Sequence, residues 1–123
     1  DYADKLAKAE KGKEPPRDLR MEAFAKVVKG ELPLLVTVHR ANDIVSAIRL
    51  GKEFNLRMVL DGVAEAPMVL NEIKASGYPV IVHASQLRSG GDAENVSFET
   101  ASKLKAAGIP FALQTGYEAY VPK

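Results

Sequence analysis

The fold is decided by the apolar stretch Leu34-Leu35-Val36-Thr37-Val38, which ends at His39. Similar short apolar runs follow at Met58–Leu60, Val80–Val82 and Phe111–Leu113. Near-continuous apolar runs of this length are typical of parallel strands covered on both faces, whereas a one-sided antiparallel sheet would alternate apolar and polar residues. From Leu32 onward the sequence therefore predicts four parallel strands, repeated with a period of about 22 residues.

Segments with helical spacing separate these runs. Apolar residues recur at helical intervals over Ile44–Leu50, Val69–Ile73 and Ala101–Ala107. The last two segments run into Gly77 and Gly108, and glycine is the residue that most often follows a helix C-terminus. Strand and helix in alternation, with short connections, imply right-handed parallel crossovers. We therefore predict an α/β fold, a partial TIM (β/α)8 barrel fragment of about four parallel strands with flanking helices.

The length of the chain bears on how much of a barrel it can contain. Its 123 residues fit one domain, about half the length of a complete eight-stranded α/β barrel. We divide it into an N-terminal helical segment, residues 1–31, and a half-barrel of strand–helix repeats, residues 32–123. Asp18 is a good N-cap for a helix from Leu19 to Lys29. The start at Asp1 without an initiator methionine gives weak support to a fragment.

Composition narrows the classes of function. The chain is 46% hydrophobic and 27% charged, which is typical of an ordinary globular protein. Its formal net charge of +1 provides no field that would draw the whole chain to nucleic acid or to an anionic membrane, and no partner of either kind is expected. The absence of cysteine excludes disulfides, thiolate metal ligands and a cysteine nucleophile.

Polar residues follow the predicted strands at equivalent positions. They are His39, Asp61, His83 and the pair Thr115-Gly116. Because the C-terminal ends of parallel strands share one edge, these residues should converge there. Imidazole and carboxylate groups ligate zinc, manganese or nickel, so His39, Asp61 and His83 are a candidate metal set, with Asp61 and His83 also candidate catalytic groups. Two alternatives stay open: each histidine is a hydrogen-bonded residue of the rim or the core, or Asp61 caps the following helix.

Candidate substrate-binding residues lie close to the same edge. Arg40 follows His39, and Arg88 lies in the long connection Ser85–Asn95, where a guanidinium can hold a carboxylate through two hydrogen bonds. Thr115 is a third candidate. Long connections after strands are often functional, although this one is equally compatible with a tolerated surface insertion.

Three stretches resemble a known family. They are Pro33–Ile44, Met58–Gly62 and Ala107–Gly116. They look like the latter half of the barrel in the amidohydrolase superfamily, in its imidazolonepropionase-like branch, and the resemblance covers roughly residues 32–123. In that family the fifth, sixth and eighth barrel strands end in histidine, histidine-glycine and threonine-aspartate. These groups bind metal and supply the catalytic aspartate.

The resemblance assigns roles position by position and also reveals departures. His39 matches the fifth-strand metal ligand, whereas Asp61, before Gly62, stands where the sixth-strand histidine is expected. Gly116, after Thr115, stands where the catalytic aspartate is expected, and glycine cannot act as a base toward a metal-bound water. A first-strand His-x-His pair is absent from the chain. The resemblance thus implies a divergent subgroup with an altered metal site.

The resulting functional hypothesis is a fragment of a metal-dependent amidohydrolase-like enzyme. The intact parent would hydrolyse amide or cyclic amide bonds of a small molecule through a metal-activated water, with zinc as the first choice of divalent metal. The fragment alone would be inactive and would bind metal weakly or not at all. Its exposed barrel edges predict a homo-oligomer. The alternative is a small, non-catalytic, doubly wound α/β module that binds a ligand or a protein.

Overall fold

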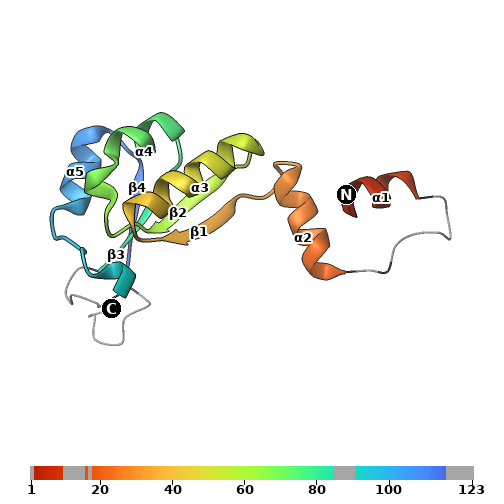
Figure 1. The fold of residues 1–123 in the computed structure, drawn as a ribbon, viewed down its shortest axis with the longest axis horizontal. Coiled ribbons are helices and arrows are strands. Elements are labelled where there is room, and N and C mark those ends of the chain that lie inside the picture. The colour runs from red at the N-terminus through yellow and green to blue at the C-terminus, as the bar shows by residue number, and fades with distance from the viewer. Residues whose placement is uncertain (1, 10–15, 17, 85–90, 116–123) are drawn as a thin grey trace.

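The computed structural model of the protein describes residues 2–9, 16, 18–84 and 91–115 (Figure 1). Its helices and strands are, in chain order, α1 (Tyr2–Lys8), α2 (Leu19–Val28), β1 (Leu34–Val38), α3 (Ala41–Glu53), β2 (Met58–Gly62), the 3-10 turn η1 (Ala66–Met68), α4 (Leu70–Ser76), β3 (Val80–His83), the 3-10 turn η2 (Gly91–Ala93), α5 (Thr100–Ala107) and β4 (Phe111–Gln114).

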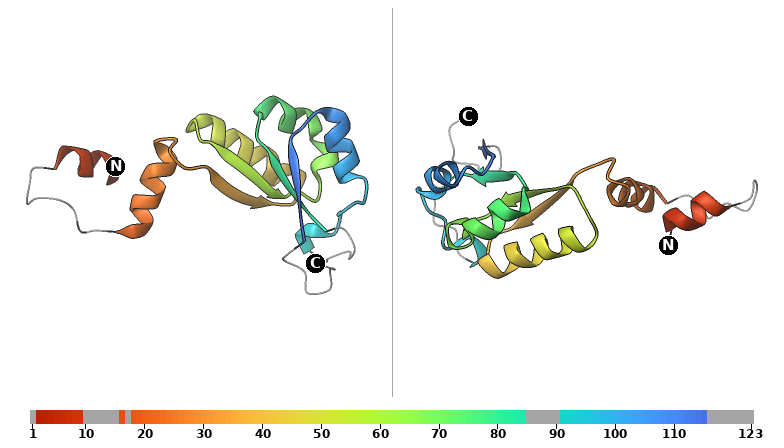
Figure 2. Two further views of the ribbon diagram at one scale, coloured as in Figure 1. Left: turned by 180° about the vertical axis from the view of Figure 1, so that it is seen from behind. Right: turned by 90° about the horizontal axis from the view of Figure 1, so that it is seen from above.

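The four strands form one sheet in the order β1-β2-β3-β4, and every neighbouring pair is parallel. Helices α3, α4 and α5 connect consecutive strands and all lie on the same face of the sheet (Figures 1 and 2). This is the arrangement of consecutive strand–helix units in a (β/α)8 barrel. The predicted α/β class, with four parallel strands and flanking helices, is confirmed.

The strand order also decides between the two α/β architectures. A doubly wound sheet reverses its strand order at a switch point and carries helices on both faces. The described sheet has no reversal, and its connecting helices cover one face only. The doubly wound alternative is therefore wrong for this sheet, because each crossover continues in the same direction as the one before it.

The core lies between the sheet and its three helices. Alternate residues of each strand point toward the helices, and the most deeply buried side chains come from both layers: Ile44, Leu60, Ile73, Val80 and Leu104. Burying such a side chain stabilises a fold by about 1.5–3 kcal/mol. The opposite face of the sheet is uncovered by any described element (Figure 2), and Leu35 on it is 58% exposed. The apolar runs in the sequence predicted that other elements would pack on both faces of the sheet. Among the described residues, elements pack on one face only.

The helix ends follow the expected local chemistry. Gly77 and Gly108 end α4 and α5 in the left-handed conformation, with φ of +74° and +73°. At the other end of a helix, the Asp18 carboxylate accepts hydrogen bonds from the backbone N–H groups of Arg20 and Met21. This capping fixes the start of α2 where the sequence placed it.

Two helices, α1 and α2, precede the sheet and lie beyond the N-terminal end of β1 (Figure 1). The apolar face of α2 is mostly uncovered, since Leu19, Phe24 and Val28 are more than half exposed and only Val27 is buried. The division of the chain at residues 31 and 32 stays a prediction. Among the described residues, no helix is both long enough and apolar enough to cross a membrane.

Candidate functional site

Asp61 lies at the centre of a hydrogen-bonded cluster that spans three strands. It belongs to β2 and is 7% exposed. On one side the hydroxyl of Thr37, from β1, donates to Asp61 Oδ2 at 2.9 Å. On the other side Nε2 of His83, at the end of β3, lies 2.7 Å from Asp61 Oδ1. We call these three residues the Thr37–Asp61–His83 cluster.

The sheet register explains why these side chains meet. Thr37 is the direct partner of Asp61 in the parallel pairing of β1 and β2, and Ile81 is the partner of Asp61 in β3. His83 lies two residues beyond Ile81, so its side chain shares the same face of the sheet. That face is the one the helices leave uncovered. The cluster therefore lies at the C-terminal edge of the sheet, on what would be the inside of a barrel.

Both carboxylate oxygens of Asp61 have partners, which removes the large cost of burying an unpaired carboxylate. An ionised carboxylate can only accept hydrogen bonds, so the Thr37 hydroxyl donates and His83 Nε2 carries a proton. A distance of 2.7 Å is short, as expected for a charge-assisted bond. Asp61 does not cap a helix, and that alternative is wrong because its carboxylate points across the sheet to both neighbouring strands.

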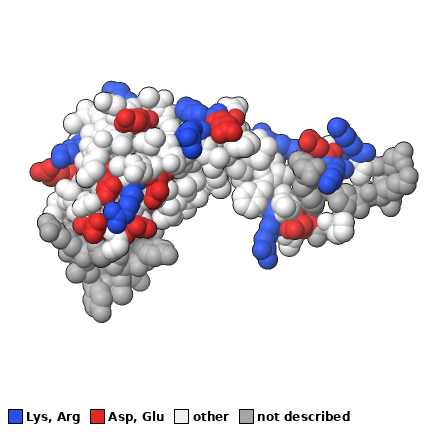
Figure 3. Space-filling model, viewed as in Figure 1, with Lys and Arg blue, Asp and Glu red and all other residues white. Residues whose placement is uncertain are grey.

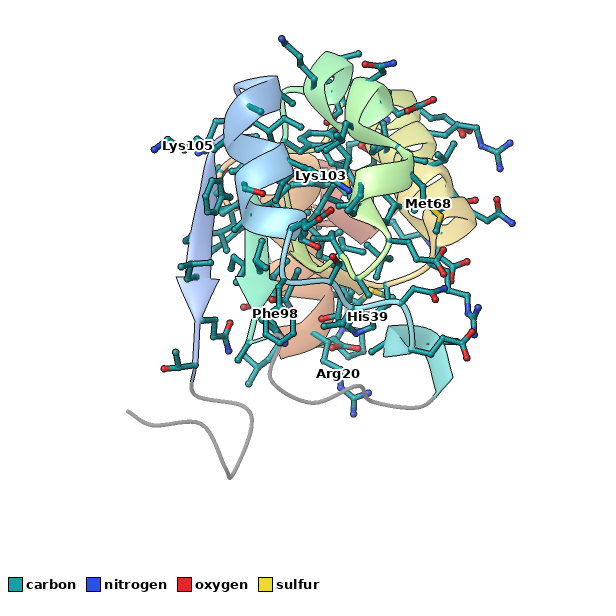
Figure 4. The ribbon with its side chains drawn as sticks, turned by 90° about the vertical axis from the view of Figure 1, so that its left-hand side faces the viewer. Arg20, His39, Met68, Phe98, Lys103 and Lys105 are labelled. Atoms are coloured by element: carbon teal, nitrogen blue, oxygen red, sulfur yellow. The ribbon has the colours of Figure 1, made fainter. Side chains whose placement is uncertain are left out.

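His39 occupies a second, separately built position at the same edge (Figure 4). Its ring packs directly on Gly62, where an added Cβ would lie 2.8 Å from Nδ1 and closer still to Cε1. The Nδ1 atom is buried and has no hydrogen-bond partner among the described residues. A buried polar atom of this kind is uncommon in folded proteins, where such atoms ordinarily have a partner in the protein or in ordered water.

The backbone that supports His39 is strained. Gly62 has a φ of +89°, and the next residue, Val63, has a φ of +43° although it is β-branched and fully buried. Val63 N–H donates to the carbonyl of Val38 at 2.7 Å, which ties the strained turn to the end of β1. Non-glycine residues in the left-handed region cost about 1–3 kcal/mol and cluster at functional sites.

Glu65 forms hydrogen bonds with three segments at this edge of the sheet. Its carboxylate accepts from the Ala41 N–H at 2.7 Å, at the first turn of α3, and from the Asn95 side-chain amide at 2.6 Å. Its own N–H donates to the carbonyl of His39 at 2.9 Å. The hydrogen bond from Ala41 and then that from Asn95 hold the pKa of Glu65 below its ordinary value. Glu65 thereby fixes the turn that carries His39.

Arg40 is engaged with acidic groups from another part of the chain. Its guanidinium lies 3.1 Å from Asp92, 3.2 Å from Glu94 and 3.9 Å from Glu65, and it donates to the carbonyl of Gly91 at 3.1 Å. The hydrogen bond to Asp92, more than any other contact, raises the pKa of Arg40. A substrate carboxylate would have to displace Asp92 or Glu94 from this guanidinium. The substrate-binding role of Arg40 stays a prediction.

Replacing Glu65 by alanine is expected to lower the free energy of unfolding by about 1–3 kcal/mol, because two donors lose their acceptor. Since the folded-state pKa of Glu65 is lowered, its stabilisation is complete above the ordinary value of 4.5 and is lost as the pH falls through the lower folded-state value. Urea unfolding between about pH 3 and pH 7 should show the difference between wild type and variant shrinking in acid. Glu72→Ala, at an exposed position of α4, is the matched control; an equal effect from both variants would contradict this role.

For two other predicted site residues, Thr115 and Arg88, the structure gives less information. Thr115 follows β4 at the same edge and is exposed. Arg88, and with it most of the long connection, lies outside the described residues, as does Gly116. Their predicted substrate-binding roles stay predictions.

Sequence reasoning missed Thr37, Glu65 and Asn95. Thr37 reads as an ordinary β-former within an apolar strand. Glu65 left a signal, because it and Asp61 are the only charged residues between positions 58 and 70. Asn95 left none, since its partner is 30 residues away in the sequence.

Comparison with known proteins identifies the type of fold. No family model matches the chain, and no curated protein matches it. A solved structure does match, that of an amidohydrolase from Thermotoga maritima MSB8, with 28% sequence identity and a TM-score of 0.81. The match covers 97% of this chain and 30% of that one. The chain has an amidohydrolase-like fold. It spans less than a third of the amidohydrolase that it matches.

The amidohydrolase-like fold raises the question of whether the chain binds a metal ion. The described residues do not form a metal site. Among them, no group of three or more histidine, aspartate, glutamate or cysteine side chains can hold a metal. The predicted set of His39, Asp61 and His83 does not form such a group among the described residues. On the face of the molecule that Figure 3 shows, the acidic and basic side chains of the described residues are intermixed.

Proposed function

We propose that this chain is part of the barrel of an amidohydrolase-like enzyme that hydrolyses amide or cyclic amide bonds of a small molecule. The observation that carries the proposal is the Asp61–His83 pair, joined at 2.7 Å on the uncovered face of a sheet whose fold matches an amidohydrolase. Catalytic residues of α/β barrels lie at the C-terminal ends of the strands, which is where this pair lies.

In this proposal the Asp61–His83 pair accepts a proton from the attacking water and later donates it to the leaving group. Because Nε2 of His83 holds a proton against Asp61, the ring nitrogen that can accept one is Nδ1. His83 would take a proton from water as the water adds to the amide carbonyl, and Asp61 would stabilise the imidazolium. His83 would then return the proton to the leaving nitrogen as the C–N bond breaks. The metal-activated water implied by the family resemblance would need ligands beyond the described residues.

Amide hydrolysis by the intact barrel protein tests the proposal. We expect the protein to release amine from members of a panel of linear and cyclic amides, measured by mass spectrometry of the products. The 123-residue chain alone is expected to be inactive, since the described sheet supplies only part of a barrel wall. Absence of turnover on every amide by a folded intact protein would contradict the proposed function.

We also propose that the isolated chain associates with itself. Strands β1 and β4 are the outer strands of the described sheet, and exposed strand edges and apolar sheet faces favour pairing with another chain. Light scattering of the purified chain should give a mass above that of one copy. A monodisperse monomer at high concentration would contradict this.

A further inference from the structure

We infer that Thr37 is a positioning residue that sets the orientation of the Asp61–His83 pair; this inference rests on the proposed function. Thr37 is the fourth of the five residues of β1, is exposed, and pairs with Asp61 in the sheet register. A threonine at such a position ordinarily turns its hydroxyl to water. Here the hydroxyl instead donates to the buried carboxylate of Asp61 at 2.9 Å.

The geometry of a carboxylate explains why a second donor matters. The terminal torsion of an aspartate side chain is broad, so one hydrogen bond leaves the carboxylate plane free to rock. Thr37 and His83 approach Asp61 from the two neighbouring strands, one at each oxygen. Held from both sides, the carboxylate plane keeps Oδ1 directed at His83 Nε2.

This orientation has a chemical consequence for His83. While Oδ1 faces Nε2, the proton of the neutral ring stays on Nε2, and Nδ1 is the nitrogen that can accept a proton. Loss of the Thr37 hydroxyl would leave Oδ2 without its side-chain donor, and the carboxylate could turn to recover one. The ring would then lose the contact with Asp61 that favours the proton on Nε2 and helps to hold its direction.

Thr37 offers a clean pair of variants. Valine has almost the same shape as threonine and a similar preference for strands, so Thr37→Val replaces the hydroxyl by a methyl group and changes little else. Thr37→Ser keeps the hydroxyl and removes a methyl group. A role in strand formation alone would be preserved by valine, whereas a role in orienting Asp61 would be preserved by serine.

The test is ¹⁵N NMR of the His83 ring in the 123-residue chain, with unfolding midpoints to confirm that each variant folds. We expect the Nε2 resonance of Thr37→Val to move from the position of a protonated nitrogen toward the average of two tautomers, and Thr37→Ser to restore the wild-type position. An unchanged Nε2 resonance in a folded Thr37→Val chain would overturn the inference. A shift that serine fails to restore would overturn it as well.

Measurements of enzymatic turnover distinguish a failure of this inference from a failure of the proposed function. In the intact barrel protein, Thr37→Val is expected to lower kcat about 10–100-fold with little change in KM, since a misoriented base loses rate rather than binding. If the intact protein hydrolyses no amide while the NMR result holds, the proposed function fails and the orienting role of Thr37 remains. If the protein is active and Thr37→Val has the wild-type kcat, the inference fails and the proposed function remains.

Discussion

Replacing His83 by glutamine in the intact barrel protein is expected to lower the rate of amide hydrolysis by about 10²–10⁴-fold, the usual contribution of general acid–base catalysis. A glutamine amide can still donate to Asp61, so the hydrogen bond across β2 and β3 survives. It cannot accept a proton at neutral pH, so the activation of water is lost. The measurement is kcat and KM on whichever amide the wild-type protein turns over.

Asp61→Asn provides a second test of the same pair. An asparagine amide has nearly the shape of the carboxylate but cannot stabilise an imidazolium, so kcat should again fall. The matched control is Asp43→Asn, the same substitution at an exposed position in the first turn of α3, which should leave kcat near wild type. Folded His83→Gln and Asp61→Asn proteins with full activity would show that the pair has no catalytic role.

Gly62→Ala is expected to have the largest effect on stability, a loss of about 2–5 kcal/mol in the free energy of unfolding. Two costs add. The backbone at Gly62 has a φ of +89°, which disfavours any side chain, and a methyl group there would collide with the ring of His39. Urea unfolding of the 123-residue chain measures the loss.

Two variants separate the costs at Gly62. Gly77→Ala introduces a methyl group at a φ of +74° with no atom within 4 Å, so it measures the backbone cost alone, about 1–2 kcal/mol. In the double variant His39→Ala/Gly62→Ala the ring is absent, and the collision term should disappear. Equal losses for Gly62→Ala and Gly77→Ala would mean that His39 does not pack on Gly62 as described.

Much of the fold could be predicted from the sequence because its signals are local. The run Leu34–Val38 coincides with β1, and the glycines at 77 and 108 mark the ends of two helices. The later strands extend one or two residues beyond their apolar runs, because Asp61, Gly62, His83 and Gln114 continue the pairing. The sequential strand order could not be distinguished from a doubly wound one, since both arise from the same alternation of elements.

The candidate site was predicted only in outline. Parallel strands had to bring Asp61 and His83 to one edge, but the direct hydrogen bond between them was not predicted, and the described residues form no group of three metal ligands. Arg40 was expected to bind a substrate carboxylate, yet Asp92 and Glu94, more than 50 positions away in the sequence, form ion pairs with its guanidinium. Partners of this kind depend on how distant loops fold back over the sheet, which no local pattern reports.

The outer strands β1 and β4 have an engineering consequence. Each has one side in the described sheet where backbone N–H and C=O groups meet no neighbouring strand. Parallel strands from a separately expressed polypeptide could dock along both sides at once. Under the proposal that the chain is part of a barrel, we expect fragment complementation, in which two polypeptides without a covalent link reconstitute one cylinder.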